Sequence, residues 1–598
     1  MANLHSFACR TFCVGHLKFL LVFLIAIFIA SDCFSLPRTP SQAFPDMFRK
    51  PPGSDFDYFK RKQADIPSVP ETTQDIELED EVIITPSSII ILTPQELQNV
   101  IDVKKFENIA LQRNFNTQGL YDLALQIEQE FSQKGYPLVR VTLPIQELEP
   151  ENATIFFKII DGFIEKIDLS KVPKNQRLRT FAYLKQIIKK KSLKLSNLER
   201  QLLLASNSSG TTLTTSLIAG NEEGGTILLV EGKHKLLSGG VTIDNSQNKE
   251  LGRKQGQLRA SLHSPLGLGE TITAYGLAKA SNDGIFGSGY NVPIRAGGVA
   301  FSLPLASNGL NLGTTYTESM TRPGEDVESL GLEANMKSAS INISYPVIYK
   351  RDVALLSRAS INWIDEIQHT NAGGTDEEIS HDRITSVKAG VGLNRCTEYC
   401  LSLDAEITKG LEIGSRSRKD VGLGTPLSRD AADVNFSHLR VSAKYEGIFF
   451  DNYNLSINSG GQYSFSGSLL NSEQMGVAGE NRLSGIASGG ISGDEAWYIR
   501  TQASKKIQLS NNLGVSPYVY AATGISYLSD PSSAERKSTS ARATGVGLEF
   551  GGTDDLLVEK SVTGKFEFSK NWASSNLEKT HDTRFSNNQM FLKLSMNF

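Results

Sequence analysis

"QMFLKLSMNF", residues 589–598, closes the chain with an alternation of apolar and polar side chains. One face carries only apolar residues, namely Met590, Leu592, Leu594, Met596 and Phe598. The opposite face carries mostly polar residues, namely Gln589, Lys593, Ser595 and Asn597. A period of two places successive side chains on opposite faces of a β-strand. The segment therefore predicts a strand with one apolar and one polar face.

The same alternation recurs between residues 235 and 598, for example in "HLRVSAKYEGIFF" (438–450), with Gly, Asn, Asp and Ser clusters between segments. Membrane barrels use strands of about 9–11 residues, apolar outside and polar inside. Because lipid offers no partner to an unpaired backbone group, such a sheet must close. About sixteen candidate strands follow "GGVTIDNS" (239–246), and bacterial single-chain barrels have even strand numbers. The pattern favours a transmembrane β-barrel over residues 235–598; a soluble β-sandwich is the alternative.

The N-terminus resembles a secretory signal peptide. Arg10 and Lys18 precede an apolar run, residues 19–30, and small residues follow up to Ser35. We expect a signal peptide over residues 1–35, with an uncleaved anchor as the alternative. No later run reaches the length of a spanning helix, so a membrane role must use strands. An exported barrel of this kind is expected in the bacterial outer membrane, in contact with its lipid.

Composition limits the classes of function that the chain is expected to have. The formal net charge of the 598 residues is only −4, which gives no reason to expect nucleic acid as a partner. The eight histidines are scattered, and neither a phosphate-cradling motif nor a cluster of catalytic residues is apparent. Acid-rich "DEEISHD" (376–382) is explained most simply as a solvated loop. We therefore expect no enzyme activity, no cofactor and no metal.

Two cysteines remain beyond the signal, Cys396 and Cys400 in "NRCTEYCLSL" (394–403). They lie four residues apart between two strand-like segments, where a small disulfide loop could close a hairpin in an oxidising envelope. A metal site would need further His or Cys nearby, and the neighbouring sequence has none. The disulfide is the favoured prediction.

Residues 36–80 are rich in Pro, Lys and acidic side chains and predict a linker or a plug segment. Two small α+β modules should follow, over residues 81–168 and 169–234. Each has two helical patterns and two strand patterns, and each is large enough for only a modest core.

Helix signals place the elements of the two modules. Thr93 and Glu96 suggest a capping box at the first helix, and Ser196 and Glu199 suggest another in the second module. A helix near residues 116–134 should carry one apolar stripe, and Gly135 should end it in a left-handed conformation.

Three stretches resemble the two-partner secretion translocators, the TpsB or haemolysin-activator family. Residues 131–169, with "KGYPLVRVTLPIQ", and residues 195–231 look like the first and second POTRA domains of that family. Residues 244–276 look like its first barrel hairpin. The resemblance implies POTRA domains in the periplasm and export, without ATP, of a large partner protein, a β-helical exoprotein of haemolysin or adhesin type. It also implies insertion by the barrel-assembly machinery through the terminal Phe598.

Capture of the cargo is expected in the first POTRA domain, by strand addition in a groove between a helix and a strand. The groove residues would be Leu123, Ile127, Tyr136, Leu138, Val139 and Val141. The alternative is that this stripe forms the core of the module.

A long loop, "NSEQMGVAGENRLSGIASGGISGDEAWYIR" (471–500), resembles the sixth extracellular loop of the family, which folds into the lumen. The family's V-R-G-Y tip aligns with Leu483, Ser484, Gly485 and Ile486, so its arginine is absent. The partner aspartate is absent from "PYVYAATGISY" (517–527) as well. We expect the loop to insert through backbone and apolar contacts, or through Arg482; a loop that no longer inserts is the alternative.

Three other classes of protein compete with a translocator. A barrel-assembly factor shares the architecture but usually has more POTRA domains, and a degenerate pore with POTRA domains is also compatible with the missing arginine. A general porin would need no such domains. The sequence does not identify the cargo.

Overall fold

The computed structural model describes most of the chain beyond the predicted signal peptide. The described residues are 39–43, 83–207, 209–248, 250–279, 292–422, 424–510, 513–531, 535–551, 561–573 and 588–598. Within these ranges no helix is both long and apolar enough to cross a membrane. The predicted signal peptide, and the predicted linker apart from residues 39–43, lie outside the described residues.

The first module packs two helices on a three-stranded sheet of order β1-β3-β2. Its elements are β1 (Thr85–Leu92), η2 (Gln95–Leu97), α4 (Val103–Ala110), α5 (Thr117–Gln133), β2 (Arg140–Thr142) and β3 (Glu151–Ile160). The capping box expected at Thr93 is wrong, because Pro94 caps only the single turn of η2 and no side-chain cap forms there. The first full helix starts ten residues after Thr93, at Val103.

Helix α5 follows the sequence prediction closely. Asn116 caps its N-terminus by accepting the Gly119 N–H at 2.8 Å. Gly135 has φ of +89°, the left-handed conformation expected just beyond the helix end. The buried stripe of the helix consists of Leu120, Leu123, Ala124, Ile127 and Phe131. This stripe forms the core of the module against β1 and β3.

The second module repeats the plan with a sheet of order β4-β6-β5. Its elements are β4 (Phe163–Lys171), α6 (Lys174–Leu184), η3 (Lys185–Ile187), α7 (Leu195–Ser206), β5 (Thr211–Ala219) and β6 (Gly225–His234). Strand β4 pairs with β6, so the boundary between the modules falls before Phe163 and not at residue 168. The predicted Ser196 capping box is also wrong, because Lys194 is the N-cap residue of α7 and makes no side-chain cap bond.

The remaining strands of the described residues, apart from the short pair β18 and β19, form one closed antiparallel barrel. Its first half comprises β7 (Leu237–Asp244), β8 (Gln255–His263), β9 (Thr271–Lys279), β10 (Ile294–Pro304), β11 (Asn311–Thr321), β12 (Glu333–Tyr349), β13 (Val353–Thr370) and β14 (Glu377–Cys396). Its second half comprises β15 (Tyr399–Leu411), β16 (Ser437–Phe449), β17 (Tyr453–Ser464), β20 (Glu495–Lys505), β21 (Ile507–Ser510), β22 (Leu513–Tyr527), β23 (Ser538–Gly551), β24 (Ser561–Ala573) and β25 (Asn588–Asn597). Strands β20 and β21 both pair with β22 and act as one span, which gives the sixteen spans that the sequence predicts.

The faces of the barrel follow the predicted alternation. Along β25 the side chains of Leu594, Met596 and Phe598 are exposed, as expected for a lipid-facing wall. Between them, Lys593 and Ser595 line a recess on the inner side. The barrel closes where β25 pairs with β7 and where Phe598 exchanges two backbone hydrogen bonds with Gly239, at 2.8 and 3.0 Å.

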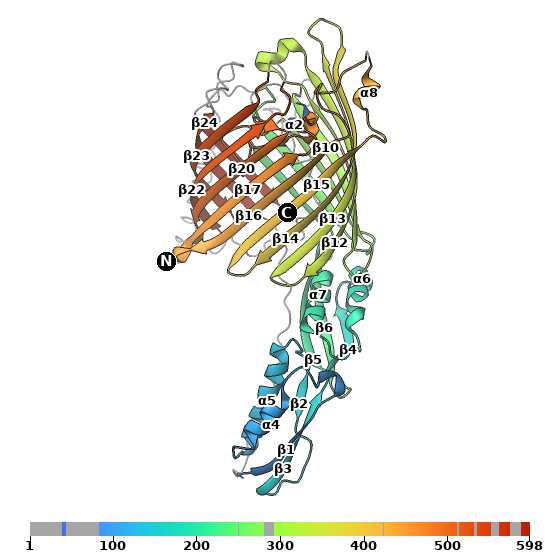
Figure 1. Cartoon of the computed structure of the whole chain (residues 1–598), viewed down its shortest axis with the longest axis vertical. Helices are drawn as coiled ribbons and strands as arrows, with labels where there is room; N and C mark the ends of the chain where they lie inside the picture. Colours follow the sequence, from blue (N-terminus) through green and yellow to red (C-terminus); the bar gives the residue numbers. More distant parts are fainter. Residues whose placement is uncertain are drawn as a thin grey trace, which may run out of the picture.

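Both modules project from one end of the barrel (Figure 1). Arg200 of α7 donates to Pro346 O of β12 at 2.7 Å, and Gln186 donates to Ser307 Oγ in the β10–β11 turn at 2.6 Å, both at that end of the barrel. Tyr349 and Ala354 of the barrel belong to the buried cluster of the second module. The second module is therefore docked on the barrel at the end where the strand connections are mostly shorter, as they are on the periplasmic side of bacterial barrels. Cys396 and Cys400 lie opposite each other at the same end, joined by a disulfide with a Cα–Cα distance of 4.1 Å.

Candidate functional site

The loop between β17 and β20, residues 465–494, lies inside the barrel. Within it β18 (Met475–Gly476) pairs with β19 (Ser492–Gly493), after one turn of η6 (Asn471–Glu473). Loop and inner wall share one buried cluster: Met475, Val477, Ala478, Leu483, Ile486 and Ile491 of the loop, with Ala496, Tyr518, Tyr520, Ala522, Ala541 and Ala543 of the wall. We expect these apolar contacts between the loop and the wall to hold the loop in place.

A polar network holds the tip of the loop. The guanidinium of Arg500 on β20 donates to Ser484 Oγ at 2.6 Å and to Glu567 Oε2 on β24 at 2.9 Å. Ser484 also hydrogen-bonds to the second oxygen of Glu567. Tyr518 donates its hydroxyl to Glu567 at 2.8 Å, and the Arg500 guanidinium lies 3.6 Å from the centroid of the Tyr520 ring. The tip is therefore fixed by an ion pair that belongs entirely to the wall.

The ion pair is almost completely buried, with 1% of the Arg500 side chain and none of the Glu567 side chain exposed. Desolvating two charges is expensive, and their attraction compensates only if further hydrogen bonds satisfy both groups. Ser484 and the two tyrosines supply such contacts. The loop tip thus completes the solvation of the pair, and the pair in turn fixes the tip.

Small residues on the wall make room for this network. Arg500 is in register with Ala522 of β22, which is in register with Ala543 of β23, so the neighbouring side chains in the row of Arg500 are small. A Cβ atom on Gly545 would lie 2.5 Å from the Tyr520 ring, so that glycine is needed where the ring leans over β23. Tyr518 leans over Gly547 in the same way.

The backbone next to Ser484 is held equally tightly. Asn571 of β24 donates its side-chain amide to Gly485 O at 2.8 Å. A Cβ atom on Gly485 would lie 2.1 Å from the Asn571 side chain, so any other residue would push the tip away from the wall. Gly485 therefore matches its counterpart in the family motif, whereas Ser484 stands where the family has arginine.

Arg482 does not replace the missing arginine. Its guanidinium donates to Gly476 O of the loop at 3.1 Å and lies over the Tyr498 ring of β20, away from Glu567. Sequence reasoning missed both Arg500 and Glu567. The available signal was their position, since each is a charged residue at an inward-facing place between apolar or aromatic neighbours, in "WYIRTQ" (497–502) and "FEF" (566–568).

A second buried ion pair closes the loops at the extracellular end. Asp494, fully buried at the base of the loop, accepts from the Arg429 guanidinium at 2.8 Å. It also accepts the backbone N–H groups of Leu469 and Ser529, each at 2.9 Å. One carboxylate thus ties together the β15–β16 loop, the inserted loop and the β22–β23 loop. In the ranges that the structure describes, no three His, Cys, Asp or Glu side chains gather closely enough to hold a metal ion.

A short N-terminal segment lies at the same end of the barrel. Helix α2 (Pro40–Ala43) lies near the end opposite the modules (Figure 1). Ser41 donates its backbone N–H and its hydroxyl to the two oxygens of Glu366 on β13, at 2.9 and 2.7 Å. Ala43 packs against Leu251, Leu277, Ile294 and Ala296. These residues fall within the segment predicted to be a linker or a plug.

The predicted groove of the first module is not open. Leu123, Ile127, Val139 and Val141 are buried in its core, Leu138 belongs to the core of the second module, and Tyr136 is half-buried. The expectation that these side chains line a binding surface is therefore corrected: the apolar stripe of α5 forms the core. What borders the edge of β2 is Glu128 of α5, which accepts the Val141 N–H at 2.7 Å.

These features define a class of protein: a β-barrel with two α+β modules at its periplasmic end and a long loop fixed in its lumen. Residues 224–550 match the family model of the haemolysin secretion/activation protein ShlB/FhaC/HecB. That match covers more than half of the chain, and the chain belongs to this family. It is an outer-membrane translocator of the two-partner secretion type, with its POTRA modules in the periplasm.

Individual relatives agree with this assignment. The chain is 22% identical over 404 residues to the hemolysin transporter protein HpmB of Proteus mirabilis, covering 66% of this chain and 68% of HpmB. It is 22% identical over 418 residues to the outer membrane transporter CdiB of Dickeya dadantii, covering 69% and 71%. The structure of CdiB from Escherichia coli has the same fold, with a TM-score of 0.66, 17% identity and coverage of 93% and 97%.

Proposed function

We propose that this translocator exports one large partner protein, which reaches the periplasm unfolded and leaves through the barrel. The observation that carries the proposal is the inserted loop, because its tip is still fixed to the wall although the family's arginine is missing. Arg500 and Glu567 supply an ion pair at the tip with different residues. A pore that had lost its transport role would have no need of a second set of residues for this purpose.

Capture of the cargo is assigned to the edge of β2 in the first module. This strand has three residues, and its outer edge offers the Val141 N–H, which Glu128 now accepts. An extended cargo segment can add to an unpaired strand edge through backbone hydrogen bonds. In this mechanism the cargo backbone displaces Glu128, so recognition depends on the edge rather than on the buried side chains of α5.

Passage requires both luminal obstructions to move. The inserted loop occupies the inner wall along β20–β24, and α2 is anchored at the extracellular end by Glu366. The polar contacts that each makes with the wall can be exchanged for contacts with a moving chain, while the apolar cluster of the inserted loop separates from the wall. Folding of the cargo outside the cell prevents its return and supplies the driving force.

Insertion of the barrel itself is assigned to the barrel-assembly machinery, with Phe598 as the signal. Phe598 lies next to the closing strand pair, and its ring lies against Gly239 at the periplasmic rim.

Deletion of residues 85–160 tests the proposal. The deletion removes the first module, together with Leu138 of the second module's core, and leaves the rest of the second module, which is the one docked on the barrel. We expect one large protein to disappear from the culture medium while the barrel remains in the outer membrane. Loss of many barrel proteins at once would instead indicate an assembly factor, and unchanged secretion would contradict capture by the first module.

A further inference from the structure

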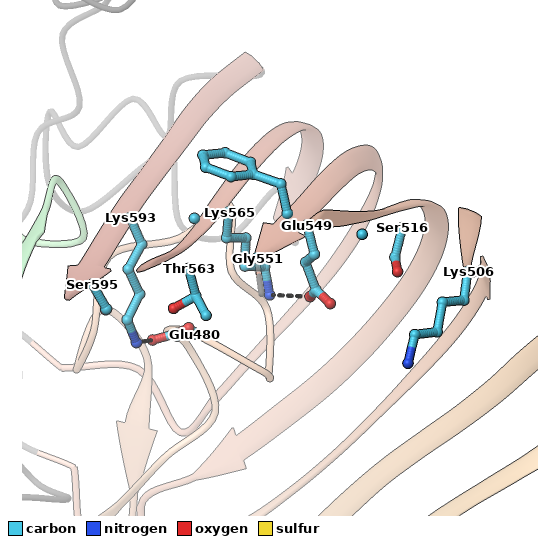
Figure 2. A pocket seen from close by; sticks show the side chains of 12 residues that line it. Glu480, Lys506, Ser516, Glu549, Gly551, Thr563, Lys565, Lys593 and Ser595 are labelled. Atoms are coloured by element: carbon cyan, nitrogen blue, oxygen red, sulfur yellow. Dashed lines mark hydrogen bonds and ion pairs between the residues drawn. The ribbon is translucent and has the colours of Figure 1, made fainter. Parts of the chain in front are cut away.

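A recess of about 430 Å³ opens on the inner wall near the periplasmic ends of β22–β25 (Figure 2). Three lysines line it: Lys506, Lys565 and Lys593. Two glutamates line it as well, Glu480 from the inserted loop and Glu549 from β23. The recess therefore has more lysines than glutamates. It lies on the periplasmic side of the inserted loop, from which a cargo chain enters.

The space exists because the wall lacks side chains at its floor. Gly514 of β22 and Gly551 of β23 are directly paired, and both fall on the inward-facing alternation of their strands. Glycine is otherwise unfavourable within strands and often marks a place where a ligand or another backbone comes close. Around this floor stand the hydroxyl groups of Ser516, Thr563 and Ser595.

The loop itself places a carboxylate in the recess. Gly479 and Asn481 have φ of +108° and +62°, and the Arg482 N–H closes the turn on Gly479 O at 3.1 Å. Glu480 stands at the corner of this tight turn, and its side chain accepts from Lys593 Nζ at 2.8 Å (Figure 2). Left-handed residues on both sides of Glu480, one of them an asparagine, are an unusual conformation that aims Glu480 at β25.

Glu549, the other carboxylate of the recess, is held more loosely, at 3.6 Å from Lys565 on the neighbouring strand. In the Lys593–Glu480 pair, about one-third of each side chain stays exposed. Partly exposed ion pairs of this kind contribute little stability and exchange readily. An incoming carboxylate can therefore replace Glu480 on Lys593 without a large free-energy cost.

The geometry points to a carboxylate-binding site, in which an extended acidic segment of the entering cargo takes the place of Glu480. The inference deepens the proposed function, on which it rests, by giving the site a ligand class. Displacing Glu480 removes the contact between the loop and β25, so arrival of the cargo loosens one anchor of the loop. Attraction between the segment and the lysines should weaken as salt rises, because the site is open to solvent.

The full chain in detergent micelles tests this with a synthetic peptide of alternating Glu and Ser. Lys593→Gln should weaken peptide binding about two- to fivefold, the range for partly exposed ion pairs. Glu480→Gln should strengthen binding by a similar factor, because it removes the competing carboxylate. Opposite effects of the two variants are not expected if the pair merely stabilises the barrel.

Lys505→Gln is the matched control, because Lys505 lies on the outward-facing alternation of β20 next to the Tyr453 ring. It should leave binding of the Glu–Ser peptide unchanged. A peptide of alternating Gln and Ser should bind more weakly than the acidic peptide, and equally to all variants. The inference is overturned if Lys593→Gln and Glu480→Gln act in the same direction, or if neither changes binding. That result leaves the proposed function intact, because secretion by cells whose translocator lacks residues 85–160 tests the proposed function separately.

Discussion

Arg500 and Glu567 stand on β20 and β24 with two strands between them, yet their side chains meet at 2.9 Å beneath the tip of the inserted loop. Arg500 is in register with Ala522 and Ala543, whereas Glu567 is in register with Gly547, so the pair meets obliquely across the wall. The loop contributes the Ser484 hydroxyl and the Arg482 carbonyl to this group of charges. The loop tip thus meets the charges with neutral groups, and both charges stay on the wall.

Replacing one partner of this ion pair should destabilise the protein more than replacing both partners. Glu567→Gln leaves Arg500 buried without its counter-charge, which costs about 3–5 kcal/mol in comparable sites. The double variant Arg500→Met with Glu567→Met should recover much of that loss in the free energy of unfolding, measured in micelles. Both variants should release the loop tip and raise ion conductance. A double variant less stable than Glu567→Gln would contradict this account.

Transferring the arginine from the wall to the loop tests how the tip is held. Ser484→Arg alone places a second cation beside Arg500 and should expel the tip, which increases conductance and cleavage of residues 480–487 by added protease. Combining it with Arg500→Ser moves the arginine to the tip, opposite Glu567, and should restore low conductance. If the combined variant behaves like Ser484→Arg alone, the tip is held mainly by the apolar cluster.

The extracellular clamp at Asp494 should control access to the loops. Arg429→Ala removes the contact of the β15–β16 loop while leaving three other donors on Asp494. We expect faster cleavage of residues 412–436 by proteinase K on intact cells, with the barrel still folded. Arg418→Ala is the control, since Arg418 is an exposed residue of α8 (Arg418–Val421) in the same loop. Equal cleavage of the two variants would argue against a clamp.

The N-terminal segment should be released by a single substitution. Glu366→Ala removes both acceptors that hold Ser41, so α2 loses its polar anchor at the extracellular end. Ion conductance in planar bilayers should rise, whereas Ser41→Ala, which keeps the backbone hydrogen bond, should have a smaller effect. Glu377→Ala, at an exposed glutamate on β14, serves as the control and should leave conductance unchanged.

Glu128 makes the first module sensitive to pH. Burial raises the pKa of its carboxyl above 4.5, against the opposing effects of the Val141 hydrogen bond and of Arg140. A raised pKa in the folded state favours folding below 4.5 and loses that contribution as the pH rises through the higher value. Glu128→Gln keeps an acceptor for Val141 without the charge. Hydrogen exchange of residues 136–143 should therefore slow in the variant, relative to the original chain, near pH 7 but not near pH 4.

The sequence predicted the parts of this protein that depend on local periodicity. The alternation in β25 and β16 predicted a closed barrel, and the stripe and terminal glycine of α5 predicted that helix almost to the residue. The capping boxes at Thr93 and Ser196 failed because tertiary packing started the helices elsewhere. The Arg500–Glu567 pair could not be predicted, because its two side chains meet across strands whose register and curvature are set only by the whole barrel.

Holding the charges on the wall has a consequence for the open channel. In the arrangement that the family motif implies, a departing loop carries its arginine away and leaves a bare carboxylate on the lumen surface. Here withdrawal of Ser484 removes only a neutral hydroxyl, and Arg500 stays against Glu567. The conduit should therefore keep the same ionic preference whether it is shut or conducting, and basic stretches of a passing polypeptide would find no newly uncovered anion to which they could adhere.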